Sequence, residues 1–235
     1  MFKYLSKLNY LIKDTIMTVS IENFVKTIYN QSRLAVVDTR ISTLARLLNI
    51  TNAAATDMAR KLATKKLINY TKYKPLTLTS TGNHLALNVI RKHRLWESFL
   101  YKTLNLSLHE IHKEAENLEH FTSDFLADKI EKYLGFPTTD PHGDPIPVLN
   151  KEVEIDHAQI LLSDANAGFE YEISRLFSSE KDFFDFCSSN QISVGSTIWV
   201  EKQFNANKMT EIIINQNKIL LNEDFTNIIY VKQLN

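Results

Sequence analysis

The chain has 235 residues, enough for two compact domains or for one domain with a smaller appendix. Its hydrophobic fraction of 44% is ordinary for a soluble globular protein, and no apolar run reaches the length of a transmembrane helix. The 27 Lys and Arg residues balance 27 Asp and Glu residues, so the overall charge excludes neither a nucleic-acid partner nor a cation.

The first seventeen residues superficially resemble a targeting segment, because they combine three lysines with apolar residues. However, Lys7 and Lys13 interrupt the apolar stretch, and no small-residue cleavage site follows it. Met17 stands just before the first predicted helix. We therefore expect that Met17 is the biological start or that residues 1–17 form a loose N-terminal arm, and we do not expect secretion.

Three amphipathic helices are predicted next, because apolar residues recur at helical spacing over residues 20–31, 40–48 and 52–65. Ser20 can cap the first of these helices, and Thr51 can cap the third. The second and third helices are separated only by a short turn, and the third has a polar, basic outer face. This layout predicts a helix-turn-helix.

A β-hairpin is predicted directly after the third helix. Residues 67–70 and 76–79 have the composition of short strands, with a turn at Tyr73-Lys74-Pro75 between them. A hairpin in this position is the wing of a winged helix, and Lys72 and Lys74 at its tip can meet DNA phosphates. Helix-turn-helix geometry also occurs in proteins that never touch DNA, which is the alternative.

The charge distribution supports a nucleic-acid partner for this head. Residues 33–74 contain nine Lys and Arg against two Asp and Glu, whereas residues 105–160 contain four Lys against twelve Asp and Glu. A basic head on an acidic body fits phosphate attraction and cation binding, respectively. Two solvated faces of opposite charge would explain the same numbers.

The third helix supplies most of the candidate DNA contacts. Asn52, Thr56 and Asp57 lie near its start, where side chains usually reach base edges in the major groove. The other candidates are basic residues suited to phosphate contacts, which position a protein without reading sequence. They are Arg60, Lys61, Lys65 and Lys66, with Lys72 and Lys74 in the wing. Each of them singly is also explained as a solvated surface charge.

Histidines and glutamates cluster in the helices predicted after Gly82, the first of which covers residues 83–104. The motifs are His93-x-x-x-Glu97 and His112-x-x-x-Glu116-x-x-Glu119-His120. Residues four apart share a helix face, so these side chains can converge on one cation. An oxygen-rich set without thiolate favours Mn²⁺ or Fe²⁺ over structural zinc. The alternative is a solvated acidic helix with incidental histidines.

From Ile21 to Pro147 the chain resembles the diphtheria-toxin-repressor and manganese-transport-regulator family of metal-dependent repressors. The stretches that carry the resemblance are Asn23–Tyr29, Arg91–Glu97, His112–His120, and Gly135–Pro137 with Asp140–Pro147. The last two, joined behind a winged helix, are highly specific. The resemblance implies a homodimer with two metal ions per subunit and manganese-importer genes as targets.

The resemblance also implies metal ligands. A primary, regulatory site would use Glu116, Glu119 and His120 with the side chain of Asn23. A second site would use His93, Glu97 and His112. An acid of the C-terminal domain, matched to Glu180, would complete that second site, and Asp140 stands where some manganese-type relatives supply a further primary-site ligand.

Three departures from the family pattern affect these expectations. Glu116 replaces the cysteine of the iron-sensing branch, and a carboxylate in place of a thiolate favours manganese. Asn23 replaces Asp or Met and brings no charge, so the primary site would bind more weakly or recruit Asp140. Ala53 and Ala54 stand where relatives often have proline, so the operator sequence is not transferable.

The C-terminal part reads as a linker followed by strands. Proline and glycine mark residues 137–150 as the linker. The expected strands cover residues 168–177, 192–200, 211–221 (with a turn near 216–217) and 226–232, with a helix over 181–188. Such short strands suggest a small barrel, and the resemblance implies an SH3-like one.

Cys187, the only cysteine, lies in the helix among aromatic residues and is expected to be a buried, unreactive thiol, as suits a reducing compartment. Glu154-x-x-His157 is interpreted as structural.

The predicted fold is thus mainly α with a small β domain. It comprises a winged helix-turn-helix (18–82), a helical metal-binding and dimerisation domain (83–136), the linker and an SH3-like domain (151–235). The predicted function is a cytoplasmic, homodimeric repressor of metal-uptake genes. It would be activated by Mn²⁺, with Fe²⁺ as the alternative, and would bind palindromic operator DNA. Metal would shift the population towards one spacing of the two recognition helices, and the apolar faces of residues 83–104 and 123–134 would form the dimer interface.

Two rival functions remain at this point. One is a winged-helix regulator that ignores metal. The other is a metalloenzyme, but carboxylate-bridged di-metal oxidases usually need two helical Glu-x-x-His pairs, and no predicted helix has one. No His-Glu-x-x-His, Gly-x-Ser-x-Gly or phosphate-loop motif occurs either, so no enzymatic activity is expected.

Overall fold

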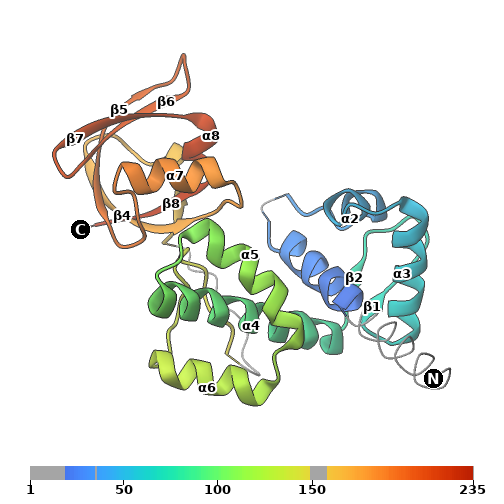
Figure 1. Cartoon of the computed structure of the whole chain (residues 1–235). Coiled ribbons are helices and arrows are strands. Elements are labelled where there is room, and N and C mark those ends of the chain that lie inside the picture. Colours follow the sequence, from blue (N-terminus) through green and yellow to red (C-terminus); the bar gives the residue numbers. More distant parts are fainter. Residues whose placement is uncertain (1–18, 35, 149–157, 235) are drawn as a thin grey trace. The chain divides into compact units, whose positions relative to one another are not determined.

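A computed structural model describes residues 19–34, 36–148 and 158–234 (Figure 1). They form two compact units. The first contains the described residues up to Lys92 together with Glu119–Phe121 and residues 147–148. The second contains His93–Leu118, Thr122–Ile146 and the described residues after 157. Among the described helices, none is both long and apolar enough to cross a membrane. The expectations for residues 1–17 and for Glu154 and His157 lie outside the described residues.

The first unit contains the predicted winged helix. Its elements are a first helix (residues 19–32), α2 (Ile41–Leu47), α3 (Asn52–Thr64), β1 (Ile68–Asn69) and β2 (Thr77–Leu78). The strands β1 and β2 pair antiparallel to form the wing. As predicted, Thr51 caps α3, since its hydroxyl oxygen accepts a hydrogen bond from the backbone N–H of Ala54 at 3.1 Å.

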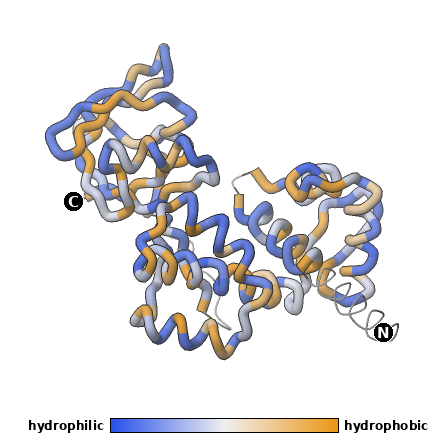
Figure 2. The backbone as a smooth tube through the Cα atoms, viewed as in Figure 1, coloured by the Kyte–Doolittle hydropathy of each residue, from blue (hydrophilic) through white to orange (hydrophobic). Residues whose placement is uncertain are grey.

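The apolar stripes of these helices form the core of the head. Phe24 and Ile28 of the first helix, Leu44 of α2 and Leu62 of α3 are fully buried together with Leu76 before β2. Figure 2 shows hydrophobic and hydrophilic residues interspersed along each helix. This spacing buries one face and leaves the other to solvent.

The long helix α4 (Ser80–Leu104) begins earlier than predicted and runs through both units. The helix was predicted to begin after Gly82, but Gly82 lies in its first turn. A Cβ atom at this position would be 1.9 Å from the carbonyl oxygen of Leu67, so only glycine allows the helix to approach the backbone just before β1 so closely. The hydroxyl of Thr79 accepts a hydrogen bond from the Gly82 N–H at 3.1 Å and begins the helix.

Two shorter helices pack beside the second half of α4. They are α5 (Leu108–Leu118), which continues into the 3₁₀ turn η1 (Glu119–Phe121), and α6 (Asp124–Leu134). Ser123 caps α6, and Gly135 ends it with φ +80°. Leu95, Ala127, Ile130 and Ile146 form a small buried cluster at the centre of this helical body.

The C-terminal domain is a six-stranded antiparallel sheet with strand order β3-β8-β4-β5-β6-β7. The strands are β3 (Ile160–Leu161), β4 (Phe169–Leu176), β5 (Thr197–Phe204), β6 (Met209–Ile214), β7 (Asn217–Asn222) and β8 (Ile229–Gln233). The helix α7 (Lys181–Ser189), the short helix α8 (Glu223–Thr226) and the 3₁₀ turn η2 (Leu162–Asp164) accompany them. The predicted small β domain is therefore confirmed.

Two details of this domain are informative. The strand β5 begins at Thr197 rather than at the predicted Ile192, because Gln191 and Gly195 have φ +58° and +86° and turn the chain between them. Cys187 of α7 is buried in the core of the domain, as predicted. Burial raises the pKa of its thiol to about 12, so the reactive thiolate is strongly disfavoured.

Much of the predicted linker is an ordered, largely buried loop over residues 139–146. Thr139 and Pro145 form a bridge across its neck, and Asp140, His142 and Ile146 are buried. Gly143 at its tip has φ +87°, and a Cβ atom there would be 2.1 Å from the carbonyl oxygen of Ser174 in β4. The loop thus packs directly on the backbone of the C-terminal sheet.

We predict that Gly143→Ala destabilises the protein by about 1–3 kcal/mol more than Gly195→Ala. Both substitutions force alanine into a left-handed conformation, which costs about 1–2 kcal/mol. Only Gly143 also meets the backbone of Ser174, since Gly195 has no atom within 4 Å of the added methyl group. Urea unfolding of the two variants measures the difference, and equal midpoints would contradict the close packing.

Candidate metal centre

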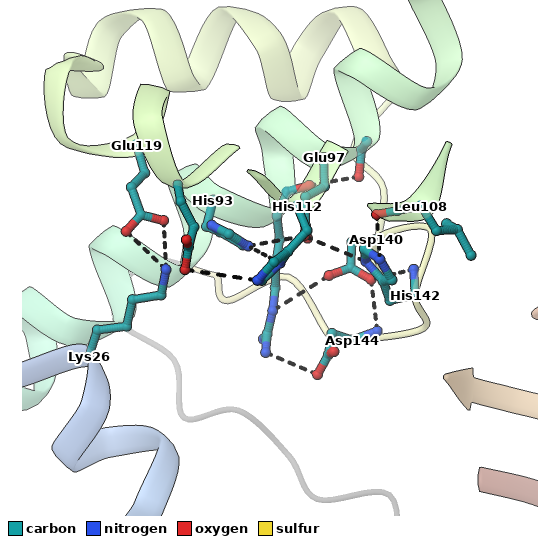
Figure 3. Close-up of polar contacts among 12 residues, drawn as sticks. Lys26, His93, Glu97, Leu108, His112, Glu119, Asp140, His142 and Asp144 are labelled. Carbon is teal, nitrogen blue, oxygen red and sulfur yellow. Dashed lines mark hydrogen bonds and ion pairs between the residues drawn. The ribbon is translucent and has the colours of Figure 1, made fainter. Parts of the chain in front are cut away.

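Three predicted ligands meet where α4 passes α5, within the second unit (Figure 3). His93 and Glu97 lie one turn apart on α4, and His112 extends from α5. The distances are 3.0 Å from His93 Nε2 to Glu97 Oε1, 3.0 Å from His112 Nδ1 to the same oxygen, and 3.2 Å between the two nitrogens. Three donor atoms thus point to one place, as a cation site requires.

Glu97 is the buried centre of this cluster, with 2% of its surface exposed. Burial alone would raise the pKa of its carboxyl group. The charge of His93 and hydrogen bonds from His112, His142 and His93 outweigh that effect and hold the pKa well below its usual range. Glu97 therefore stays ionised. One carboxylate and two imidazoles without a thiolate suit Mn²⁺ or Fe²⁺, so these residues fit a divalent cation.

The loop 139–146 brings two more groups to the same centre. His142 Nδ1 lies 3.6 Å from Glu97 Oε1, and ligand atoms of Glu97, Asp140 and His142 lie within 4.8 Å of one another. Burial raises the pKa of Asp140 well above its usual range, and the nearby charges of Glu97 and Asp144 add to the effect, although Arg94 and His142 oppose it. Asp140 is thus placed beside the second-site residues.

Charged groups around the loop hold it in place. Arg94 of α4 lies 3.1 Å from Asp144 and 3.7 Å from Asp140, and it also donates to the backbone carbonyl of Pro145. Arg175 of β4 forms an ion pair with Asp144 at 2.8 Å. The loop is therefore fastened to α4 on one side and to β4 on the other.

Two ligands of the predicted primary site, Glu119 and His120, lie in the first unit and contact the first helix. Lys26 donates to both oxygens of Glu119 at 2.9 and 2.7 Å, and the side chain of Glu119 is only 1% exposed. His120 Nδ1 lies 2.6 Å from Glu22 Oε2, while His120 Nε2 lies 3.2 Å from Glu119 Oε1. Because Nδ1 faces a carboxylate, Nε2 is the nitrogen available to a cation.

The remaining predicted ligands are placed as follows. Asn23 is half-buried on the first helix, between Glu22 and Lys26. Glu116 is exposed on α5, with its carboxylate 3.8 Å from His112 Nε2. Glu180 is exposed before α7, and its backbone N–H donates to the hydroxyl of Ser178. Glu180 belongs to neither of the ligand groups found among the described residues.

The candidate DNA contacts lie on the accessible face of the head. Asn52, Asp57, Arg60, Lys61, Lys65, Lys66, Lys72 and Lys74 are exposed, and Thr56 is half-buried. In the wing, Lys72 lies over the ring of Tyr73, which is 90% exposed. The arrangement leaves a basic surface available on α3 and the wing.

Sequence reasoning missed Glu22, Lys26 and His142 as members of these sites. Glu22 and Lys26 precede and follow Asn23 by one and three residues, so helical spacing from Asn23 could have indicated Lys26. His142 lies inside a stretch used for the family resemblance. A histidine between two aspartates in a Pro- and Gly-rich loop was its only local signal.

Comparison with protein families identifies two domains. Residues 17–76 match the model described as "Iron dependent repressor, N-terminal DNA binding domain". Residues 79–148 match "Iron dependent repressor, metal binding and dimerisation domain". Both descriptions are of repressors rather than enzymes.

Among curated relatives, the iron-dependent repressor IdeR of Mycobacterium tuberculosis is 33% identical over 128 residues, covering 54% of this chain and 55% of IdeR. The chain thus spans about half the length of this relative. The diphtheria toxin repressor of Corynebacterium diphtheriae is 27% identical over 198 residues, covering 80% of this chain and 85% of the relative.

Solved structures extend the likeness over nearly the whole chain. A manganese-dependent transcriptional repressor in complex with manganese is similar with a TM-score of 0.83 and 29% identity, covering 91% of this chain and 100% of that one. ScaR with bound Zn²⁺ is similar with a TM-score of 0.75 and 28% identity, covering 91% and 99%. The resemblance seen in the sequence is therefore confirmed: the chain belongs to the diphtheria-toxin-repressor family of metal-dependent transcriptional repressors, and its structural likeness is to the manganese-dependent members.

Proposed function

We propose that this protein is a Mn²⁺-activated, homodimeric repressor that binds palindromic operator DNA and controls metal-uptake genes. The observation that carries the proposal is the buried Glu97 carboxylate with imidazole nitrogens of His93 and His112 at 3.0 Å. The cluster lies in a domain of a metal-binding family, next in the chain to a winged helix with a basic face. A metal-independent regulator would have no use for such a cluster.

The proposed ligands form two sites per subunit. The second site uses His93, Glu97 and His112, and the primary site uses Glu119 and His120 with Asn23 and Glu116. When bound, a divalent cation supplies concentrated positive charge that holds carboxylates and imidazoles together. Oxygen and nitrogen donors favour Mn²⁺, and Fe²⁺ is the competing activator.

The proposed dimer interface lies on the helical body. The side chains of Tyr101 and Leu104 in α4, Phe125 and Tyr133 in α6, and Phe136 beyond α6 are 49–71% exposed. Large apolar groups gathered on neighbouring helices indicate an interaction surface. A second copy of the chain would cover them and would place two recognition helices about one DNA turn apart.

The proposed switch acts on the first helix. In the structure, the ammonium group of Lys26 in this helix donates hydrogen bonds to both carboxylate oxygens of Glu119, the atoms that a cation would bind. Glu22 orients His120 through a hydrogen bond with Nδ1. A cation held by Glu119 and His120 must compete with Lys26 for the same carboxylate oxygens. Binding would therefore exchange one contact between the first helix and η1 for another, and so bias the position of the head.

We predict that Glu119→Ala with His120→Ala abolishes the effect of manganese on DNA binding. Coupling between metal and DNA is typically worth about 5–150-fold in affinity, and the variant should lose it. Fluorescence anisotropy of labelled DNA from metal-uptake promoters, with Mn²⁺ or with chelator, measures the ratio. Glu114→Ala, which removes an exposed glutamate of α5 outside the proposed sites, is the control. Equal wild-type affinity in both conditions would favour the metal-independent regulator.

Lys26→Met should strengthen manganese binding at Glu119 and His120, because it removes the competing ammonium while keeping the aliphatic chain. Relief of a single nearby charge corresponds to about one pK unit, or about tenfold in affinity. Lys26→Arg, which keeps the charge, should bind like the wild type. Calorimetric titration compares the three proteins, and an unchanged affinity in Lys26→Met would show that the ion pair does not oppose the metal.

Lys65→Ala with Lys66→Ala should weaken DNA binding evenly across sequences and reduce its salt dependence. Each lost phosphate contact lowers the slope of log K against log salt by about 0.9. Lys113→Ala, an exposed lysine of α5 outside the head, should leave the slope unchanged. A slope that does not respond to the Lys65 and Lys66 changes would place the DNA elsewhere.

A further inference from the structure

We propose that Asp57, positioned by Arg60, selects the base that α3 reads, and that it requires cytosine at one position of each operator half-site. The inference rests on the proposed function, since it concerns how the helix-turn-helix head recognises its operator. It adds the chemical feature of the DNA that this chain would select, an exocyclic amino group in the major groove. It also assigns Arg60, one of the candidate phosphate contacts, a positioning role.

Asp57 lies in the middle of the exposed face of α3. Ala55 and Ala59, two residues before and after it, are fully buried in the core of the head. With 3.6 residues per turn, a residue between them points to the opposite side of the helix. The side chain of Asp57 is 66% exposed, and Ala53, one turn earlier on this face, is exposed but too short to screen it. The carboxylate is therefore placed where α3 would meet the floor of a groove.

A carboxylate at this place is unexpected, because the surrounding surface is basic. Residues 33–74 contain nine Lys and Arg but only two acids, Asp38 and Asp57. Asp38 is accounted for before α2, where it accepts hydrogen bonds from Arg40 and Thr43 at 2.6–2.8 Å. Asp57 would be repelled by the phosphates of bound DNA. Its presence is favourable only if DNA offers it a hydrogen-bond donor in return.

Arg60 holds this carboxylate and offsets its charge. Arg60 Nη1 lies 3.2 Å from Asp57 Oδ1, one turn along α3. An exposed ion pair of this kind adds little to the stability of a helix, so stability does not explain it. Beside DNA, the guanidinium group would reduce the repulsion from phosphates and restrict the carboxylate to one orientation. Oδ2 then remains to accept a hydrogen bond from a base.

The chemistry of the carboxylate determines which base it selects. A carboxylate only accepts hydrogen bonds. In the major groove guanine presents N7 and O6 and thymine presents O4, all of which are acceptors that would repel it. Adenine presents an amino donor at N6, but the acceptor N7 lies beside it. Cytosine presents the amino donor N4 without a neighbouring acceptor, so it is the base that a carboxylate prefers.

The test determines the base preference of the full chain, and it requires no operator to be known beforehand. A DNA library with a randomised palindromic half-site is selected in the presence of Mn²⁺, and the recovered sequences give the preference at each position. We expect cytosine at one position of each half-site. Replacing it by thymine turns the N4 donor into an acceptor and should weaken binding about 5–150-fold, as measured by fluorescence anisotropy.

Substitutions separate the carboxylate from its neighbours. Asp57→Asn has the same shape but adds a donor, so it should prefer adenine at that position. Asp57→Ala should lose discrimination there and keep it elsewhere. Arg60→Ala should reduce the preference for cytosine, and Arg60→Lys, which keeps the positive charge, should restore much of it. Asp182→Asn, which changes an exposed aspartate of α7 in the C-terminal domain, is the control and should leave every position unchanged.

The outcomes distinguish this inference from the proposed function. Because Asp57 is exposed, its variants are expected to fold. An unchanged preference profile in Asp57→Asn and Asp57→Ala would overturn the inference, as would wild-type selection of guanine or thymine at the position that these substitutions alter. Both results would leave the metal-activated repressor intact. A wild-type protein that selects no sequence, with Mn²⁺ or with chelator, would overturn this inference together with the operator binding of the proposed function.

Discussion

The helical body is organised around one buried carboxylate. Removing an ionised Glu97 from water is costly unless charged and hydrogen-bonding partners replace the solvent. Here the replacements are imidazoles from three separate segments: His93 on the same helix, His112 on α5 and His142 in the loop. Their common requirement for Glu97 fixes how α4, α5 and the loop lie against one another. The same arrangement is what makes the cluster suitable for a cation.

Most of the fold was predictable from local patterns. The apolar spacing that placed Phe24, Ile28, Leu44 and Leu62 on helix faces also placed them in the core of the head. Predicted boundaries were wrong where a residue is required by a contact with a distant part of the chain rather than by its local sequence. Gly82 is glycine because α4 passes close to the carbonyl oxygen of Leu67, a contact that the helical spacing around Gly82 does not indicate.

Part of the candidate site was also predictable from helical spacing. His93 and Glu97 are brought together by helical spacing alone, and His112 joins them because two amphipathic helices must pack. The contribution of the loop depends on Gly143, whose fit against Ser174 sets where His142 lies. The partners of Glu119 and His120 come from nearly a hundred residues earlier in the chain, so their identity had to come from the structure.

The ion pair between Lys26 and Glu119 has a consequence for the metal concentration at which the protein would respond. In the proposed primary site, a cation would have to displace the ammonium group of Lys26 from the Glu119 carboxylate, so the ion pair would lower the apparent affinity for the cation. Lys26 would then determine the cellular ion level at which the genes are silenced, separately from the ligands that choose the ion. Substitution at this one residue would then shift the metal concentration at which the proposed switch responds, without changing the ligands.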